Sequence, residues 1–400
     1  MYVSHVSLKN IRCFKNVCLD FQNPAGEGEP NNVTLILGDN SAGKTTLLKA
    51  IALAVLTPVI HNTGYRAYHM IREGMNLGKI GGSLLLQPGD GASSTYNWPT
   101  ELDFQRVGDS ETLDLPLENN RFTNGISPEH QRLKDNYYQD NHAAFFTVGY
   151  GATRRMETGD YTPGSKKSKW MPRYHWVASL FEDDVALLPL AAWLPKLNSS
   201  RRGEVLQLIN QLFPQGETRL LDKPRNGEFV VESQGLPVPF SALSDGYRAF
   251  LAWTTDLLGH LSACTPDPIA ITNMPGVVLV DEVDLHLHPA WQLLVIEKIS
   301  TLFPRLQFIL TSHSPIVAGT LPASHIYHVV RDAEGNTVTQ GSEEIMGRSA
   351  EQILLSPYFG MRSTRAAGVR RQLQELSRLA NEGDLDAARQ YLALAGRGES

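Results

Sequence analysis

The fold is decided by the stretch Val33-Thr34-Leu35-Ile36-Leu37-Gly38-Asp39-Asn40-Ser41-Ala42-Gly43-Lys44-Thr45. Its apolar run has the pattern of a buried strand, and its glycine-rich part has the form G-x-x-x-x-G-K-[ST]. The segment that follows, 46–53, has the apolar spacing of a helix. Strand, loop and helix in this order let backbone N–H groups and a helix N-terminus hold phosphates. The sequence therefore predicts a nucleoside triphosphate site.

Within this loop, Lys44 is expected to reach the β- and γ-phosphates, and Thr45 to offer its hydroxyl to Mg²⁺. The cofactors expected from the motif are ATP and Mg²⁺. The loop residues expected to bind the nucleotide are Asn40, Ser41, Gly43, Lys44, Thr45 and Thr46.

Composition limits the partners and the compartment. The chain has 400 residues, 42% of them hydrophobic and 20% charged, as in soluble globular proteins. A net charge of −6 means that any contact with nucleic acid must be local. The three cysteines form no C-x-x-C pair. The first residues do not show the basic and then apolar pattern of a signal peptide, and no segment approaches the run of about 20 apolar residues that a membrane span needs. We expect a cytoplasmic protein without a membrane partner.

Two further strand patterns end in polar residues. The run 276–280 is followed by Asp281 and Glu282, and the run 308–312 by His313. Since the carboxyl ends of parallel strands meet at one edge of a sheet, we expect these side chains beside the phosphate loop. We expect Asp281 to orient Mg²⁺, directly or through water, and Glu282 to polarise the attacking water. His313 is expected to bond the γ-phosphate or that water as neutral imidazole. The alternatives are a solvated Asp-Glu turn and a histidine satisfied by backbone.

A second anion site is predicted at Ser241-Ala242-Leu243-Ser244-Asp245-Gly246-Tyr247-Arg248, which precedes a helical pattern. Ser244 and Gly246 would leave N–H groups free at the helix N-terminus. The segment resembles the L-S-G-G-Q signature of ABC-type ATPases, from which Asp245 and Tyr247 depart.

The order of these motifs resembles the ABC-type ATPases of the SMC/RecF/OLD group. The opening Leu8-Lys9-Asn10-Ile11-Arg12-Cys13-Phe14 is similar to that group's opening, in which the basic residue touches the nucleotide. The stretches Gly149–Arg154, Asp281–Pro289 and Ile353–Gly360 look like small anti-phage ATPases, such as the PtuA component of Septu systems and retron-associated relatives.

The resemblance implies an α/β fold: an ABC-type P-loop ATPase head with a β-rich arm, a short helical insert and a helical C-terminal tail. We expect an N-terminal part of the head at 1–160, a helical lid insert at 161–235, a C-terminal part of the head at 236–345 and a helical tail at 346–400. The expected catalytic residues are Glu282, His313 and Lys44; the metal ligands are Thr45 and Asp281. Besides the loop residues, nucleotide contacts are expected from Arg12, Ser244, Asp245 and Gly246, the last three closing the site of an opposite protomer.

The function implied is that of an ATPase acting as the sensor subunit of an anti-phage system. It would form a homodimer or higher oligomer and control a separate nuclease, for example of HNH type. The segment after His313 is too short for the TOPRIM nuclease domain of OLD proteins. The alternative is a RecF-like repair clamp on DNA; a transporter ATPase suits the insertion at 57–130 and the opening less well.

Two expectations remain open at the sequence level. The basic stretch with Lys166, Lys167, Lys169 and Arg173 favours a solvated loop, and contact with DNA is the alternative that stays open. The glutamine that senses the γ-phosphate in ABC proteins has no clear match. Gln131 and Gln139 are candidates, and the segment 150–154 is another.

Overall fold

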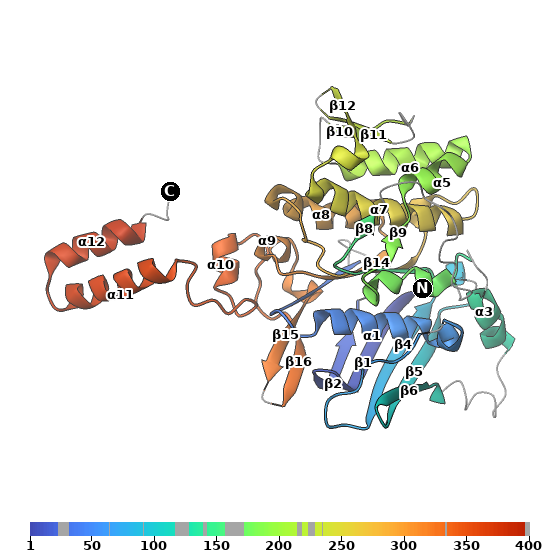
Figure 1. Ribbon diagram of the computed structural model, residues 1–400, viewed down its shortest axis with the longest axis horizontal. Coiled ribbons are helices and arrows are strands. Elements are labelled where there is room, and N and C mark those ends of the chain that lie inside the picture. Colours follow the sequence, from blue (N-terminus) through green and yellow to red (C-terminus); the bar gives the residue numbers. More distant parts are fainter. Residues whose placement is uncertain are drawn as a thin grey trace. The chain divides into compact units, whose positions relative to one another are not determined.

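A computed structural model describes residues 1–22, 32–63, 65–90, 92–116, 128–138, 142–156, 172–213, 218–222, 229–233, 235–332 and 334–396 (Figure 1). The chain divides into two compact units, Met1–Gly347 and Arg348–Ser400. Each unit is described separately below.

The first unit is built on one large mixed sheet. The strands of this sheet run in the order β6-β5-β4-β1-β2-β16-β15-β3-β14-β13-β7. Their bounds are β1 Tyr2–Ile11, β2 Phe14–Asp20, β3 Val33–Gly38, β4 Leu77–Leu86, β5 Tyr96–Val107, β6 Ser110–Asp114, β7 Thr147–Tyr150, β13 Gly276–Val280, β14 Leu306–Thr311, β15 Ile326–Asp332 and β16 Gly335–Gln340.

The half of the sheet from β15 to β7 carries the three strands that end in motif residues. Here β3, β14, β13 and β7 pair in parallel, and β15 is parallel to β3. Every residue of β13 and β14 is buried, which explains why β13 has no polar side chain and β14 has only two, Gln307 and Thr311. The carboxyl ends of β3, β13 and β14 therefore lie at one edge, as the sequence predicts.

The other half is antiparallel and includes β1, β2, β4, β5 and β6. It confirms the expected β-rich arm. The two halves meet where β16 runs parallel to β2, and the ladder there has a single pair among the described residues, Asn336 with Phe14.

Helix α1, Lys44–Leu56, contacts strands of both halves. Almost all of its side chains are buried, because its sequence is apolar on every side. This burial anchors the phosphate loop, which leads directly into α1.

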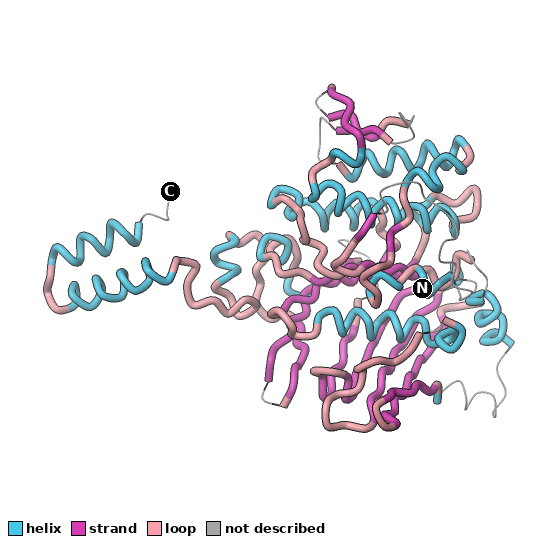
Figure 2. Tube along the Cα trace, viewed as in Figure 1, coloured by secondary structure: helices cyan, strands magenta, loops and turns pink. Residues whose placement is uncertain are grey.

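The remaining helices of the first unit are α3 Pro128–Tyr138, α4 Pro172–His175, α5 Leu190–Trp193, α6 Ser199–Leu212, α7 Asp245–Cys264, α8 Pro289–Leu302 and α9 Pro315–Ala318. In Figure 1, α6, α7 and α8 are grouped above the sheet, whereas α1 lies below them. Figure 2 shows the same separation of helices in cyan from the sheet in magenta.

The predicted helical insert is only partly helical. Its described residues contain α6 and the small antiparallel sheet β10 Thr218–Leu220, β11 Val230–Ser233 and β12 Leu236–Pro239. Within the insert expected to be helical, the segment 176–198 forms only short pieces, with β9 Ala186–Leu187 paired to β8 Arg155–Met156. Prolines at 189 and 195 interrupt this segment, since proline cannot continue a helix interior.

The second unit holds α10 Ala350–Leu354, α11 Ala367–Asn381 and α12 Leu385–Ala395. Helices α11 and α12 pack against each other as a helical hairpin within the expected helical tail. Asp384 caps α12, accepting from the N–H groups of Asp386 and Ala387 at 2.9 and 3.0 Å.

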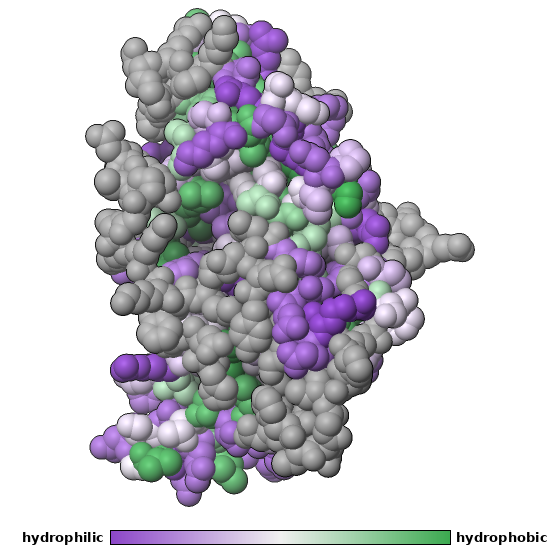
Figure 3. Space-filling view, turned by 90° about the vertical axis from the view of Figure 1, so that its right-hand side faces the viewer, coloured by the Kyte–Doolittle hydropathy of each residue, from purple (hydrophilic) through white to green (hydrophobic). Residues whose placement is uncertain are grey.

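No described helix combines the length and apolar character needed to cross a bilayer. On the face drawn in Figure 3, hydrophilic and hydrophobic residues are interspersed among the described atoms. The predicted α/β fold, with a β-rich arm and a helical C-terminal tail, is confirmed.

Candidate functional site

The phosphate loop closes at Gly43, the residue before α1. Its φ of 105° lies in the left-handed region. A Cβ at this position would come within 2.5 Å of the Cys13 Sγ and 2.8 Å of the Phe14 ring. Only glycine fits there. The turn between β1 and β2 therefore supports the loop from outside.

The Lys44 side chain is buried and folds back onto the loop. Its Nζ donates to the carbonyl oxygens of Gly38 at 2.8 Å and Asp39 at 3.0 Å. Burial lowers the pKa of the Lys44 ammonium, and the carboxylates of Asp281 and Glu282 oppose that shift. Among the described residues, the Lys44 ammonium uses two of its three N–H groups for these two carbonyl oxygens. The third N–H group can therefore donate to a bound anion.

Asp281 joins the loop to the sheet edge. Its Oδ2 accepts from the Thr45 hydroxyl at 2.6 Å, and its Oδ1 accepts from the Thr311 hydroxyl at 2.5 Å. The hydroxyl of Thr45 and the carboxylate of Asp281 are hard oxygen donors of the kind that Mg²⁺ prefers. Their closeness at the loop, from segments 236 residues apart, fits the predicted metal pair.

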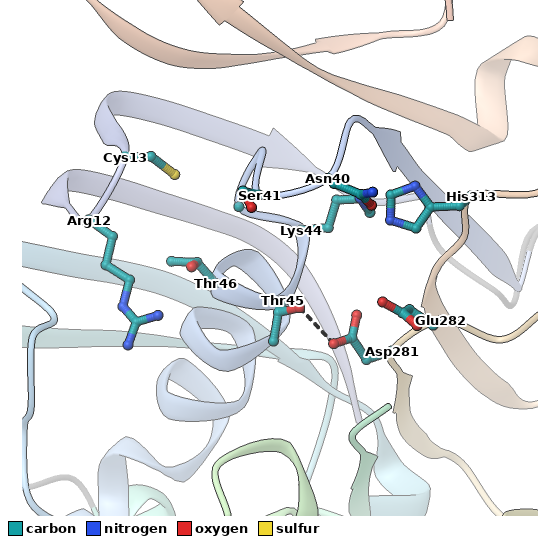
Figure 4. A pocket seen from close by; sticks show the side chains of 11 residues that line it. Arg12, Cys13, Asn40, Ser41, Lys44, Thr45, Thr46, Asp281, Glu282 and His313 are labelled. Carbon is teal, nitrogen blue, oxygen red and sulfur yellow. Dashed lines mark hydrogen bonds between the residues drawn. The ribbon is translucent and has the colours of Figure 1, made fainter. Parts of the chain in front are cut away.

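Glu282 has a strained backbone. Its φ of 48° is unusual for a residue with a Cβ and costs about 1–2 kcal/mol. Its N–H donates to the Thr311 hydroxyl at 2.7 Å. Figure 4 shows its carboxylate beside that of Asp281 and facing the same cavity.

His313 lies on the opposite side of Glu282 from Asp281 (Figure 4). Its backbone N–H approaches the Asp284 Oδ1 at 3.4 Å. Burial and the neighbouring Lys44 ammonium lower the pKa of the imidazole, and nearby carboxylates oppose them. The ring is therefore neutral at pH 7, the form that the sequence interpretation requires.

Arg12 and Cys13 come from the turn between β1 and β2. Arg12 has a φ of 46°, and its Nε donates to the His69 carbonyl at 3.0 Å. Figure 4 places Arg12 across the cavity from His313. The Met70 carbonyl oxygen also accepts from the backbone N–H of Arg12 at 2.9 Å. Two hydrogen bonds therefore hold Arg12 against the segment 69–70.

These residues surround one cavity of ≈ 380 Å³, a volume within the range of small-ligand sites. It is lined by ten predicted site residues, Arg12, Asn40, Ser41, Gly43, Lys44, Thr45, Thr46, Asp281, Glu282 and His313, and by Cys13, which the sequence did not single out. The ammonium, hydroxyl, carboxylate and imidazole groups fit the triphosphate and Mg²⁺ predicted for this site.

The signature-like turn lies apart from this cavity. Ser244, Asp245 and Gly246 are at the N-terminus of α7 and are not among the described lining residues. Ser244 is exposed, and a Cβ at Gly246 would come within 2.5 Å of the His286 carbonyl oxygen. The turn thus packs on the loop that follows Glu282. Its contact with a nucleotide stays a prediction.

Two residues at the site were not predicted to act there. Thr311 bonds both Asp281 and Glu282. Arg154 donates from Nη2 to the carbonyl oxygens of Asp281 and, at 2.7 Å, of Glu282. The sequence could have indicated Thr311 by its place in the chain, because it is the last residue of the strand that leads to His313. Arg154 lies in the segment considered for the glutamine's role.

Neither glutamine candidate is placed at the cavity. Gln131 lies on α3 and donates to Asp135 at 2.8 Å, and it does not line the described cavity. Gln139 lies outside the described residues. The γ-phosphate sensor therefore stays unassigned.

The structure corrects the prediction for Arg173. This residue is 3% exposed, and its guanidinium donates to the carbonyl oxygens of Ala144 at 3.0 Å and Phe145 at 2.8 Å. It also lies 4.9 Å from the centre of the Tyr137 ring. Arg173 is a core residue that satisfies backbone, so it does not contact DNA. Lys166, Lys167 and Lys169 lie outside the described residues.

Arg173→Ala is expected to lower the free energy of unfolding by about 3 kcal/mol, because it leaves buried carbonyls without donors. Urea unfolding measures this loss. The matched control is Arg219→Ala, which removes a 65% exposed partner of Glu232 and should cost less than about 1 kcal/mol. Equal stability of the two variants would contradict a structural role for Arg173.

Comparison with known proteins agrees with this geometry. Residues 59–318 match the family model described as "AAA domain, putative AbiEii toxin, Type IV TA system", and residues 1–64 match the model "AAA ATPase domain". The chain is 24% identical over 372 residues to "Septu protein PtuA" of Bacillus mycoides (strain KBAB4), covering 91% of this chain and 45% of that protein. It is 22% identical over 350 residues to "Retron Vc95 probable ATPase" of Vibrio cholerae serotype O1 biovar El Tor, covering 74% of this chain and 68% of that protein.

Among solved structures, "SMC head domain from Thermotoga maritima" aligns with a TM-score of 0.48 and 16% identity, over 86% of this chain and 100% of that one. The chain spans less than half the length of the Septu relative.

The fold and the site define the chain as a P-loop ATPase. It belongs to the AAA-domain family whose model covers residues 59–318. The predicted ATPase class is thereby confirmed.

Proposed function

We propose that this chain binds ATP with Mg²⁺ in the cavity beside α1 and hydrolyses its γ-phosphate. The observation that carries the proposal is the single cavity that joins Lys44, Thr45, Asp281, Glu282 and His313. These residues follow the two parallel strands β13 and β14 or begin helix α1, so the sheet and this helix hold them in position.

Each side chain has a chemical task there. Lys44 donates to the phosphate oxygens, and Thr45 and Asp281 would hold Mg²⁺, which neutralises charge on the phosphates when it is bound. The Glu282 carboxylate accepts the proton of the attacking water. His313, neutral at pH 7, can bond the γ-phosphate or that water.

We further propose that two copies close two such sites head to tail. Two observations support this. Ser244 is exposed at the N-terminus of a 20-residue helix, a position that favours anions, and it does not line the cavity of its own chain. Ser244 and Gly246 of one copy would then cap the phosphate held by Lys44 of the other.

Mixing two inactive variants tests this arrangement. Lys44→Ala and Ser244→Arg should each fail to hydrolyse ATP alone. Their mixed dimers contain one site with both native residues, so mixing should restore roughly a quarter of wild-type turnover. The two folded variants are mixed so that their subunits exchange without denaturation, and phosphate release is then measured. Absence of any recovery, with mixed dimers demonstrated by two affinity tags, would contradict shared sites.

The biological role we propose is in anti-phage defence, where the ATPase controls a separate nuclease, for example of HNH type. The support is the similarity to proteins named for Septu and retron systems. Co-expression with the products of adjacent genes, followed by purification through a tag on this chain, should recover a nuclease. A neighbourhood without any effector gene would oppose the proposal.

A further inference from the structure

The backbone of Glu282 needs support from outside its own segment. With a φ of 48°, it adopts a conformation that side-chain-bearing residues leave unless other contacts fix it. This conformation sets the direction of the bond from Cα to Cβ and therefore the aim of the carboxylate. The question is which contacts hold it.

Thr311 supplies one such contact. Its side chain is fully buried, and its single hydroxyl accepts from the Glu282 N–H at 2.7 Å while donating to the Asp281 Oδ1 at 2.5 Å. A hydroxyl has one proton to donate, and here that proton is directed to Asp281. The hydroxyl therefore ties the two acidic residues to the end of β14.

Arg154 supplies the second contact, from the other side of the peptide. Its Nη2 donates to the carbonyl oxygens of both Asp281 and Glu282, the latter at 2.7 Å, and its Nε donates to the Gly151 carbonyl at 3.2 Å. The Glu282 carbonyl also accepts from the Leu285 N–H at 3.0 Å. Both the N–H and the carbonyl of Glu282 are thus held by side chains of distant segments.

Arg154 contacts only backbone here, whereas Thr311 contacts the Glu282 N–H and the Asp281 carboxylate. Neither Arg154 nor Thr311 is among the described residues that line the cavity. Burial lowers the pKa of the Arg154 guanidinium to about 10, while the acidic groups of Asp281, Asp284 and Glu282 oppose that shift. The group is therefore a cation at neutral pH and forms charge-assisted hydrogen bonds.

We propose that Arg154 and Thr311 are positioning residues that hold Glu282 in its left-handed backbone conformation and so aim its carboxylate at the attacking water. The proposal rests on the proposed function, in which Glu282 is the general base. The proposal therefore predicts that both residues affect the rate of hydrolysis and have little effect on the affinity for ATP.

The experiment compares Thr311→Val with Thr311→Ser by steady-state hydrolysis and by ATP affinity. Valine has nearly the shape of threonine without the hydroxyl, whereas serine keeps the hydroxyl. Thr311→Val should lower kcat at least tenfold and change the Kd for ATP less than threefold. Thr311→Ser should keep kcat within about threefold of wild type. The matched control is Thr254→Val, which removes a buried hydroxyl bonded within α7, to the Phe250 carbonyl at 2.9 Å, and should leave kcat unchanged.

Arg154→Gln gives a second, independent arm. Loss of the Arg154 guanidinium, which bonds both carbonyl oxygens, should lower kcat at least tenfold, again with the Kd for ATP nearly unchanged. The proposal is overturned if kcat in Thr311→Val and Arg154→Gln equals that of wild type, or if kcat and affinity fall by the same factor. Glu282→Gln separates this result from the proposed function: if that variant still hydrolyses ATP, Glu282 is not the base, whatever the other variants do.

Discussion

Glu282→Gln is expected to abolish steady-state ATP hydrolysis while ATP still binds. The amide keeps the size of the carboxylate but cannot accept the proton of the attacking water. General bases contribute about 10²–10⁴-fold to turnover, and the loss should fall in that range. The cavity is otherwise unchanged, because Lys44, Thr45 and Asp281 hold the phosphates and the metal. The measurements are phosphate release and equilibrium binding of labelled ATP.

The same variant should accumulate as an ATP-bound dimer, because we propose that two copies close on ATP and expect that hydrolysis is what separates them. Light scattering with and without ATP measures this. The matched control is Glu73→Gln, an exposed glutamate that does not line the described cavity, which should retain turnover. Unchanged hydrolysis by the Glu282 variant would remove this residue from the role of base.

Lys44→Ala is expected to weaken ATP binding by about 100-fold, because a charge-assisted hydrogen bond to phosphate contributes roughly 1.5–3 kcal/mol. The ligand-free protein should lose little stability. The buried ammonium carries a desolvation cost, seen in its lowered pKa, and that cost disappears with it. The variant therefore separates ligand binding from folding.

Thermal unfolding checks both parts of this prediction. Wild-type protein should gain stability as ATP is added, and the Lys44 variant should not. The control is Lys15→Ala, which removes a half-exposed partner of Glu334 and should behave as wild type. A normal ATP-induced rise in melting temperature for Lys44→Ala would contradict the assignment of this lysine.

The parts predicted from the sequence are those with local causes. Largely apolar runs before Gly38, Asp281 and His313 predict buried parallel strands, and parallel strands bring their carboxyl ends to one edge. For that reason the cavity brings together Lys44, Thr45, Asp281, Glu282 and His313, whereas the expected residues Ser244, Asp245 and Gly246 do not line it among the described residues. The loop pattern alone also identifies Lys44 and Thr45.

The parts that the sequence did not predict depend on contacts between distant segments. Cys13 reaches the cavity because β1 and β2 bring their turn against Gly43, 30 residues later in the chain. Arg173 is drawn inward by the carbonyls of residues 144 and 145. In a stretch rich in lysine and aromatic residues, nothing local distinguishes a buried arginine from a solvated one.

The narrow junction between the two halves of the large sheet has a mechanical consequence. Among the described residues one ladder pair, Asn336 with Phe14, joins them, and the Asn336 side chain donates to the Ala42 carbonyl of the phosphate loop at 2.5 Å. The residue that joins the two halves is therefore hydrogen-bonded to the loop that would hold the phosphates. Amide hydrogen exchange at residues 14 and 336 should slow when that loop is occupied.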